Sequence, residues 1–365
     1  MIIAAHIQHT NGSPSLLLRY IANIAAEQTS VQFLLFYEVP VAIDGLPDNC
    51  KKILIRRPPG NSLLLHYWLS YTLPGLLKKY RANLFLSENN TCSLRTTVPQ
   101  IMLVKQDFLA STPGKTKTIH KRYLKKYFFT FVAKAADVCT TQPSLAVDLC
   151  TRYPILKDKI STIFHGLSDT YRPIDEQQQV AIQEQYTQSF NFFVCECNAA
   201  NRTQLVTVLK AFSIFKKRLK SSLQLVLINQ LNENPIPDFH LYKYRNEVQL
   251  LPASALHNQA GVIAAAYAGI EISDHDALND WGLQCMACQV PLLTVESNIT
   301  RELYHDAAAY TDMEEKTLAD KLMLLYKDET YRSIQIDKGM KTAAPYNWPQ
   351  SSQLLWQSIL QSSKV

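Results

Sequence analysis

One pattern occurs twice along this sequence and constrains the fold more than any other feature. Short, almost wholly apolar runs alternate with longer segments of helical periodicity. The apolar runs are residues 2–7, 31–37, 52–55, 84–86, 100–104, 137–141 and 159–164, and then residues 191–196, 223–229, 248–251, 269–272 and 290–295. Such alternation is typical of parallel strands whose sheet is covered by helices on both faces. The sequence therefore predicts an α/β protein with two sheets, one in each half.

The length agrees with two domains, since 365 residues at about 150 residues per domain make two. We expect an N-terminal domain over residues 1–170 and a C-terminal domain over 171–345. A final helical segment, 346–365, is expected to pack back on the first domain. Further helices are predicted over residues 204–219, 253–267, 317–326 and 331–344, and over 62–81 with an interruption near Pro74. Residues 175–190 are polar and Gln-rich, which indicates a linker or a connecting helix. Tyr67, Trp68 and Tyr71 are predicted to lie in the core.

Composition excludes several classes of protein. With 47% hydrophobic and 19% charged residues, the chain can bury two cores and is not typical of disorder. Apolar runs stay below the roughly 18 residues of a membrane span, and the first residues lack the basic start of a signal peptide. The eight cysteines fit an intracellular protein better than a disulfide scaffold. The sequence therefore predicts a cytoplasmic protein, with peripheral contact at the inner membrane face as an additional expectation.

Charge is distributed unevenly. Residues 1–160 hold 20 Lys and Arg against 9 Asp and Glu, whereas the remainder holds 17 against 22. The segment from Lys117 to Lys134 is amphipathic, with an apolar stripe opposite a basic side. It can be interpreted as a surface for an anionic membrane or an acceptor. The interpretation we favour is a domain helix whose stripe faces its own sheet. Nucleic acid is not predicted as a partner, because no binding motif accompanies the basic residues.

Two cysteine pairs raise the question of a metal. Cys195 and Cys197 lie two residues apart, and Cys285 and Cys288 three apart. Zinc takes four thiolates in such pairs. We favour buried, inert thiols, because Cys195 lies on a predicted strand with alternating side chains. No metal and no cofactor are therefore expected.

Four segments, in order, resemble retaining glycosyltransferases of family four, which have the two-domain GT-B fold. They are KISTIFHGLSDTYRPID at 159–175, FFVCECNAANRTQLVTVLKAF at 192–212, AYAGIEISDHDALNDWGLQCMACQVPLLT at 266–294, and the stretch from Glu302 through HDAAAYTD to the region of Trp356. The resemblance covers most of residues 155–360. It implies two Rossmann-like domains facing each other across a cleft, with the acceptor on the N-terminal domain and the nucleotide-sugar donor on the C-terminal one.

The resemblance also implies a reaction and the residues for it. The family moves a sugar from a nucleotide-sugar to an acceptor with retention of configuration and without a metal; here the acceptor would be a saccharide or a lipid-linked molecule. Catalytic positions fall on Asp276, beside the donor sugar, and on Gln106 and Asp107, on the acceptor side. Donor-binding positions fall on Arg202 and Asn198 at the diphosphate, Thr203 at the place of the family's Lys, Gln284 at the ribose, Gly12 in the turn after the first strand, and Trp281.

Several of these positions depart from the family pattern. Asn198 and Thr203 replace two cations, Gln284 replaces a carboxylate, and Ala277, Leu278 and Asn279 replace a Gly-Phe-Gly stretch. Trp281 can stack on a base or sugar, or fill the space that the glycines leave. Two functions are therefore predicted: a diverged glycosyltransferase, and, as the alternative, a non-catalytic GT-B protein acting as a partner or scaffold in polysaccharide assembly.

Overall fold

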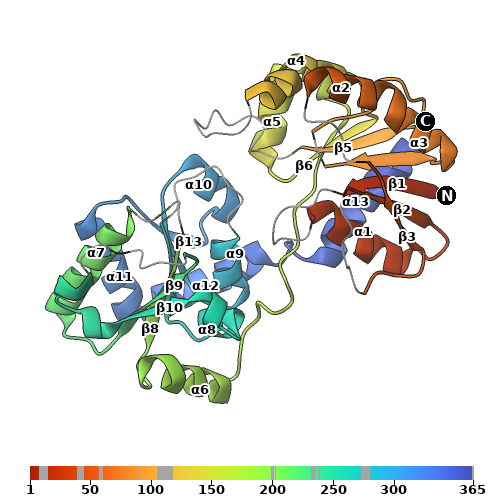
Figure 1. The fold of residues 1–365 in the computed structure, drawn as a ribbon. Coiled ribbons are helices and arrows are strands. Elements are labelled where there is room, and N and C mark those ends of the chain that lie inside the picture. The colour runs from red at the N-terminus through yellow and green to blue at the C-terminus, as the bar shows by residue number, and fades with distance from the viewer. Residues whose placement is uncertain are drawn as a thin grey trace. The chain divides into compact units, whose positions relative to one another are not determined.

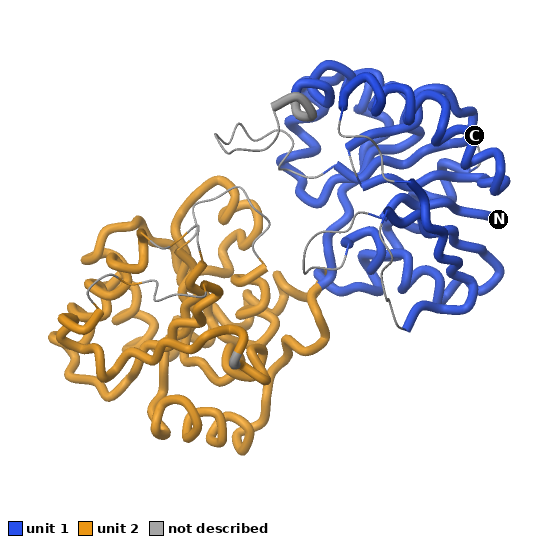
Figure 2. Tube along the Cα trace, viewed as in Figure 1, with its two compact units in different colours: residues 1–166, 346–365 blue, residues 167–345 orange. Residues whose placement is uncertain are grey.

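The computed structural model describes residues 1–7, 15–38, 45–56, 61–88, 90–104, 118–198, 201, 203–231, 236, 239–272 and 280–363, with backbone only for 118–121 and Ala255. The chain forms two compact units (Figure 2). Unit 1 consists of residues 1–166 and 346–365, and unit 2 of residues 167–345.

Unit 1 contains a seven-stranded parallel sheet in the order β3-β2-β1-β4-β5-β6-β7 (Figure 1). Its strands are β1 (Ile2–Ile7), β2 (Gln32–Tyr37), β3 (Cys50–Leu54), β4 (Leu84–Ser87), β5 (Gln100–Val104), β6 (Asp137–Thr140) and β7 (Ile160–Thr162). Its helices are α1 (Leu16–Glu27), α2 (Ser62–Tyr67), a π-helical turn (Trp68–Thr72), α3 (Leu73–Lys79), α4 (Thr118–Lys134), α5 (Pro143–Arg152), the 3₁₀ turn Pro154–Leu156 and α13 (Trp348–Ser362).

Strand alternation divides the core of unit 1 into two layers. Ala4 and Phe85 face the cluster formed with α2, α3, α4 and α5. Their neighbours Ile3 and Leu84 face the opposite cluster, formed with α1 and α13. Successive side chains of a strand point to opposite faces, so near-continuous apolar strands such as β1 require helices on both sides. The predicted first sheet is confirmed.

Unit 2 contains a six-stranded parallel sheet in the order β10-β9-β8-β11-β12-β13. Its strands are β8 (Phe192–Cys197), β9 (Gln224–Asn229), β10 (Val248–Pro252), β11 (Ala268–Glu271), β12 (Leu292–Val295) and β13 (Ala308–Thr311). Its α-helices are α6 (Glu176–Thr187), α7 (Leu205–Leu219), α8 (Gln259–Ala264), α9 (Trp281–Ala287), α10 (Asn298–Tyr304), α11 (Glu315–Lys327) and α12 (Glu329–Ala343). Three 3₁₀ turns, Phe239–Leu241, Arg245–Glu247 and Ala253–Ala255, complete it. The second predicted sheet is therefore also present.

The last helix, α13, belongs to unit 1 although the whole of unit 2 precedes it. Leu355 and Ile359 are buried in the core layer that contains α1. Ser358 donates a hydrogen bond to the Asp137 carboxylate on β6. The polar and apolar contacts together tie the end of the chain to the first sheet.

Helix capping explains the structure of two segments, one that the sequence left open between linker and helix and one that it assigned wrongly. The Gln-rich stretch is a helix, because Asp175 and Gln178 form a capping box at the start of α6. Residues 253–267, predicted as one helix, instead form a 3₁₀ turn followed by the short α8. Asn258 caps α8 by accepting a hydrogen bond from the Gly261 N–H, so the helix begins only there.

The helical segment after residue 61 is interrupted near Pro74, as predicted. The π-helical turn Trp68–Thr72 separates α2 from α3, and Pro74 occupies the first turn of α3, a position that tolerates proline. Trp68 is buried as predicted, but Tyr67 and Tyr71 are 60% and 49% exposed, so their assignment to the core is wrong.

The apolar stripe of α4 lies inside unit 1. Tyr123, Leu124, Phe128 and Phe131 are buried in the core, whereas Arg122, Lys125 and Lys126 are exposed. The interpretation of α4 as a domain helix is thus confirmed. Because its apolar stripe packs in the core, that stripe is not available for insertion into a lipid layer. Over the described ranges, no helix combines the length and the hydropathy that crossing a membrane requires.

Candidate functional site

The candidate site lies at the carboxyl edge of the second sheet. From β8 the chain moves outward to β9 and β10 on one side, then returns to place β11, β12 and β13 on the other. The strand order therefore reverses between β8 and β11. In open parallel sheets, ligands bind beyond the carboxyl ends of the strands at such a switch point. Glu196 and Cys197 end β8, and Glu271 ends β11.

Glu271 is a buried carboxyl group at this switch point. Its Oε2 accepts a hydrogen bond from Thr294 Oγ1 at 2.8 Å, and its Oε1 accepts one from the Tyr304 hydroxyl at 2.9 Å. Burial raises its pKa to about 7, although these two hydroxyls and the Gly282 N–H partly offset the shift. Glu271 can therefore gain or lose a proton near neutral pH.

Two glycines allow the close packing around Glu271. A Cβ on Gly282 would lie 2.4 Å from the Tyr304 hydroxyl, and a Cβ on Gly269 would lie 2.5 Å from Cys285 Sγ. Both distances are too short for any other residue without movement of the neighbours. These two glycines thus allow α9 to pack closely against β11. The segment that contains the predicted catalytic Asp276 follows β11 in the chain.

Glu196 is a second carboxyl group at the switch point, and its pKa is also raised by burial. It accepts hydrogen bonds from Asn198 Nδ2 at 3.3 Å and Gln230 Nε2 at 3.2 Å. The nearby Asp280 carboxylate raises the pKa further by repulsion. Such a cluster disfavours additional negative charge unless at least one carboxyl group is protonated.

Asn198 organises the loop that follows β8. Its Oδ1 accepts a hydrogen bond from the Asn201 N–H at 3.2 Å, and its own N–H donates to Asn201 Oδ1 at 2.9 Å. The Asn201 amide also donates to the Glu196 carbonyl at 2.7 Å. Thr203 is exposed, and its hydroxyl donates to Gln204 Oε1 at 2.9 Å. The two asparagines therefore bond to each other and to the end of β8, shortly before α7.

The other predicted donor residues on described segments belong to α9. Gln284 is half-buried, and its N–H donates to the Asp280 carbonyl. Trp281 is only 2% exposed. A stacking role would require the indole to leave the interior, whereas a role in filling space matches its burial. The remaining predicted residues, Gly12, Gln106, Asp107, Arg202 and Asp276, lie outside the described residues.

The cysteine pairs are buried in the same region. All four residues, Cys195, Cys197, Cys285 and Cys288, are buried as thiols and not as disulfides. Burial raises the pKa of Cys195 and Cys285 well above that of an ordinary thiol. A protonated thiol is a poor ligand and nucleophile. Within the described ranges, no three His, Cys, Asp or Glu side chains gather where a metal ion could bind.

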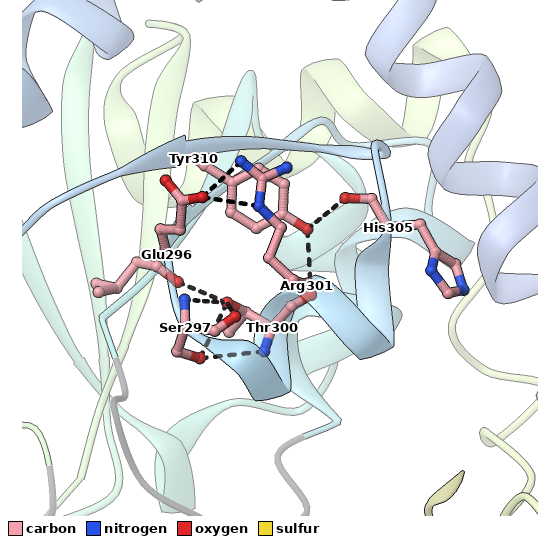
Figure 3. A network of polar contacts seen from close by, with 7 residues as sticks. Glu296, Ser297, Thr300, Arg301, His305 and Tyr310 are labelled. Atoms are coloured by element: carbon pink, nitrogen blue, oxygen red, sulfur yellow. Dashed lines mark hydrogen bonds and ion pairs between the residues drawn. The ribbon is translucent and has the colours of Figure 1, made fainter. Parts of the chain in front are cut away.

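A polar network after β12 fixes the neighbouring loop and α10 (Figure 3). Ser297 and Thr300 form a capping box at the start of the helix. Arg301 donates two hydrogen bonds to Glu296 Oε1, at 2.9 and 2.7 Å, and its guanidinium lies 3.6 Å from the centre of the Tyr310 ring. The Tyr310 hydroxyl donates to the His305 carbonyl at 2.7 Å. This cation is therefore already engaged by a carboxylate and an aromatic face.

Unit 1 has a switch point of its own, between β1 and β4. Its carboxylate is Glu88, directly after β4, which accepts a hydrogen bond from Ser15 Oγ at 2.5 Å and one from the Leu17 N–H at 3.4 Å. These donors belong to the start of α1, where unpaired N–H groups attract negative charge. An internal carboxylate thus occupies this helix terminus. His6, at the end of β1, pairs with Glu38 at 3.1 Å.

Sequence reasoning did not single out Glu271 or Glu88. Glu271 has a recognisable signal, since it interrupts the apolar run Ala-Gly-Ile-Glu-Ile at the end of a predicted buried strand. A carboxyl group in such a place requires hydrogen-bond donors or a proton. Nothing local marks Glu88, because its partners are more than seventy residues earlier in the chain.

No protein-family model matches this sequence, and no curated protein is similar enough to match it. Solved structures do match. WaaG, a glycosyltransferase involved in lipopolysaccharide biosynthesis, aligns over 99% of both chains with 12% identity and a TM-score of 0.67. Sucrose-phosphate synthase from Thermosynechococcus elongatus covers 99% of this chain and 98% of its own, with 13% identity and a TM-score of 0.71. Anabaena HepE in complex with UDP-glucose covers 100% of both chains, with 13% identity and a TM-score of 0.68.

Structural matches at sequence identities this low establish the fold, but not the family, the substrate or the roles of single residues. The matched structures are two-domain GT-B glycosyltransferases, and they extend over both sheets of this chain. The protein therefore has the GT-B fold, and the predicted fold class is confirmed at that level.

Proposed function

We propose that this protein is a glycosyltransferase that uses a nucleotide-sugar donor, with the donor subsite at the switch point of unit 2. The observation that carries the proposal is the match of the whole chain to glycosyltransferase structures, one of them containing UDP-glucose. A saccharide or a lipid-linked molecule is the proposed acceptor, and retention of configuration is the proposed stereochemistry. Both come from the sequence resemblance.

The donor residues follow the same resemblance. Asp276 would contact the sugar, Gln284 the ribose hydroxyls, and Arg202 the diphosphate. The loop after β8, held by Asn198 and Asn201, supports this proposal because it leads directly to residues 202 and 203. Trp281 is assigned to the interior of the subsite, Gly12 to the turn after β1, and Gln106 and Asp107 to the acceptor side.

The carboxyl groups of the switch point shape the chemistry of the site. A diphosphate carries negative charge, so it binds better when Glu271 and Glu196 are protonated. Both groups have a raised pKa, which for Glu271 is about 7. Donor binding should therefore weaken as the pH rises through neutrality, because ionisation adds negative charge beneath the loop.

Calorimetry with UDP, GDP and their sugar conjugates tests the proposal. We expect binding of at least one nucleotide, and a loss of about tenfold or more in affinity for Arg202→Ala, since an arginine–phosphate contact is a charge-assisted hydrogen bond. Arg218→Ala is the matched control, because Arg218 is an exposed cation of unit 2 that pairs with Asp320. Absence of binding at millimolar concentration would contradict the proposal and favour the non-catalytic alternative.

A further inference from the structure

Unit 1 exposes an apolar helix surface that its own core does not use. The surface consists of Leu63 and Leu64, which are 79% and 57% exposed, together with the exposed Tyr67 and Tyr71. We call these four residues the α2 face. At about 100° per residue they fall within roughly one third of the helix circumference. Leu65, Trp68 and Leu69 of the same segment are buried, so the core side of this segment is a different one.

The two tyrosines are ordered by ring contacts. Tyr67 and Tyr71 pair with ring centres 5.1 Å apart. The Arg95 guanidinium lies 4.7 Å from the centre of the Tyr71 ring, so a positive charge lies next to the last residue of the α2 face. Cation–π contacts of this kind keep the charge close to the aromatic surface.

Every exposed charge on the described residues of α2, the π-helical turn, α3 and α4 is positive. Lys78 and Lys79 follow on α3, and α4, which lies beside α2 (Figure 1), exposes Arg122, Lys125 and Lys126. His66 on α2 contacts the Tyr123 hydroxyl of α4 at 3.2 Å, which joins the two helices. Among the described residues from 61 to 134, the single acid is Glu88, which is 1% exposed and bonded to Ser15.

We propose that the α2 face docks unit 1 onto an anionic lipid surface. Leucine side chains would enter the boundary between headgroups and acyl chains, tyrosines would lie at the headgroup level, and the surrounding Lys and Arg would contact lipid phosphates. The uniform positive charge favours this partner over a second copy of the chain, whose equally basic surface would repel the first. The proposal goes beyond glycosyl transfer and does not depend on it.

This assignment differs from the one that the sequence suggested. On the described part of α4 the stripe residues Tyr123, Leu124, Phe128 and Phe131 are buried, so this stripe does not face the solvent. The apolar contribution comes instead from α2 and the π-helical turn, where Tyr67 and Tyr71 were predicted to lie in the core.

Vesicle sedimentation of the full chain tests the proposal. We expect binding to vesicles of phosphatidylglycerol and phosphatidylcholine, weak binding to phosphatidylcholine alone, and weakening with added salt. The triple variant Leu63→Ser/Leu64→Ser/Tyr67→Ser should lose about tenfold or more of its partitioning, because three apolar side chains no longer enter the lipid. The variant Lys125→Glu/Lys126→Glu should lose severalfold, and only with the anionic vesicles.

A matched control replaces exposed apolar residues elsewhere. Val206 and Leu241 of unit 2 are 43% and 72% exposed, and Val206→Ser/Leu241→Ser should bind like the wild type. No sedimentation with anionic vesicles, or equal loss in the control, would overturn the proposal. So would a wild-type dimer in solution that the triple variant abolishes, because the α2 face would then be an interface between two copies. Circular dichroism of each variant verifies that the substitutions leave the fold intact.

Discussion

The two sheets place a carboxyl group at equivalent points and use it in different ways. In unit 1, Glu88 follows the strand beyond the switch point and accepts hydrogen bonds from the start of α1. In unit 2, Glu271 ends the corresponding strand and is enclosed by the hydroxyls of Thr294 and Tyr304, with its pKa raised to about 7. The first carboxylate neutralises a helix terminus, whereas the second can change charge near physiological pH. The same topology thus places a helix-capping carboxylate at one edge and a buried carboxyl group with a raised pKa at the other.

The largest expected effect comes from overfilling the tightly packed region around Glu271. Gly282→Ala places a methyl group within contact distance of the Tyr304 ring and of Leu292. The overlap and the displaced hydrogen bond to Glu271 should lower the free energy of unfolding by about 4 kcal/mol. Urea unfolding measures this. Gly75→Ala is the control, because beyond its chain neighbours and its own helix backbone nothing lies within 4 Å of a Cβ there, and on α3 it should stabilise slightly. Equal stability of Gly282→Ala and the wild type would mean that this packing is loose.

Titration of Glu271 should give the next largest effect. An acid whose pKa is higher in the folded state than in the unfolded state stabilises the fold at low pH, and this contribution is lost as the pH rises. The shift from 4.5 to about 7 corresponds to about 3 kcal/mol, lost between pH 4.5 and 7. Urea midpoints across this range should show it.

Glu271→Gln should flatten that pH dependence, since the amide does not ionise. Glu184→Gln, an exposed substitution on α6, should keep it. An unchanged pH profile in Glu271→Gln would show that the two switch points do not differ in the way described.

Removal of Glu88 should have a smaller effect on unit 1. Glu88→Ala leaves Ser15 and the first N–H groups of α1 without their carboxylate, which should cost about 2 kcal/mol. Glu27→Ala is the matched control, because Glu27 ends the same helix, where a negative charge is unfavourable. Urea unfolding compares the two variants, and a loss as large for Glu27→Ala would contradict a specific role for Glu88.

The smallest effect concerns donor affinity. Thr203 is exposed, so Thr203→Lys should fold normally and add a cation to the loop after β8. We expect UDP affinity to rise about threefold to tenfold, most clearly at low salt. Calorimetry measures the change, and Lys210→Gln, a neutralised exposed cation on α7, shows the background effect of surface charge. A fall in affinity for Thr203→Lys would place the diphosphate elsewhere.

The sequence predicts the sheets better than the site. Strands such as β1 and β5 are almost wholly apolar, with one polar residue each, and their predicted limits match the structure because both of their faces are buried. Tyr67 and Tyr71 were misassigned because helical spacing shows that side chains share a face, not whether that face meets a core. The roles of Asp276 and Arg202 depend on family register, and those residues lie outside the described segments.

Long-range partners explain what the sequence did not reveal at the two edges. Glu88 acts on a helix that begins more than seventy residues earlier, and Glu271 is enclosed by groups from β12 and α10. Local patterns carry no information about such pairs. An acid inside an apolar run is the local signal at Glu271, as it is at Glu196, and no such signal marks Glu88.

A crystal structure of the protein with UDP would test the central claim most directly. The account predicts the nucleotide at the carboxyl edge of the second sheet, with its diphosphate beside the loop after β8 and its ribose near Gln284. A nucleotide bound away from the junction of β8 and β11, or none at saturating concentration, would contradict it.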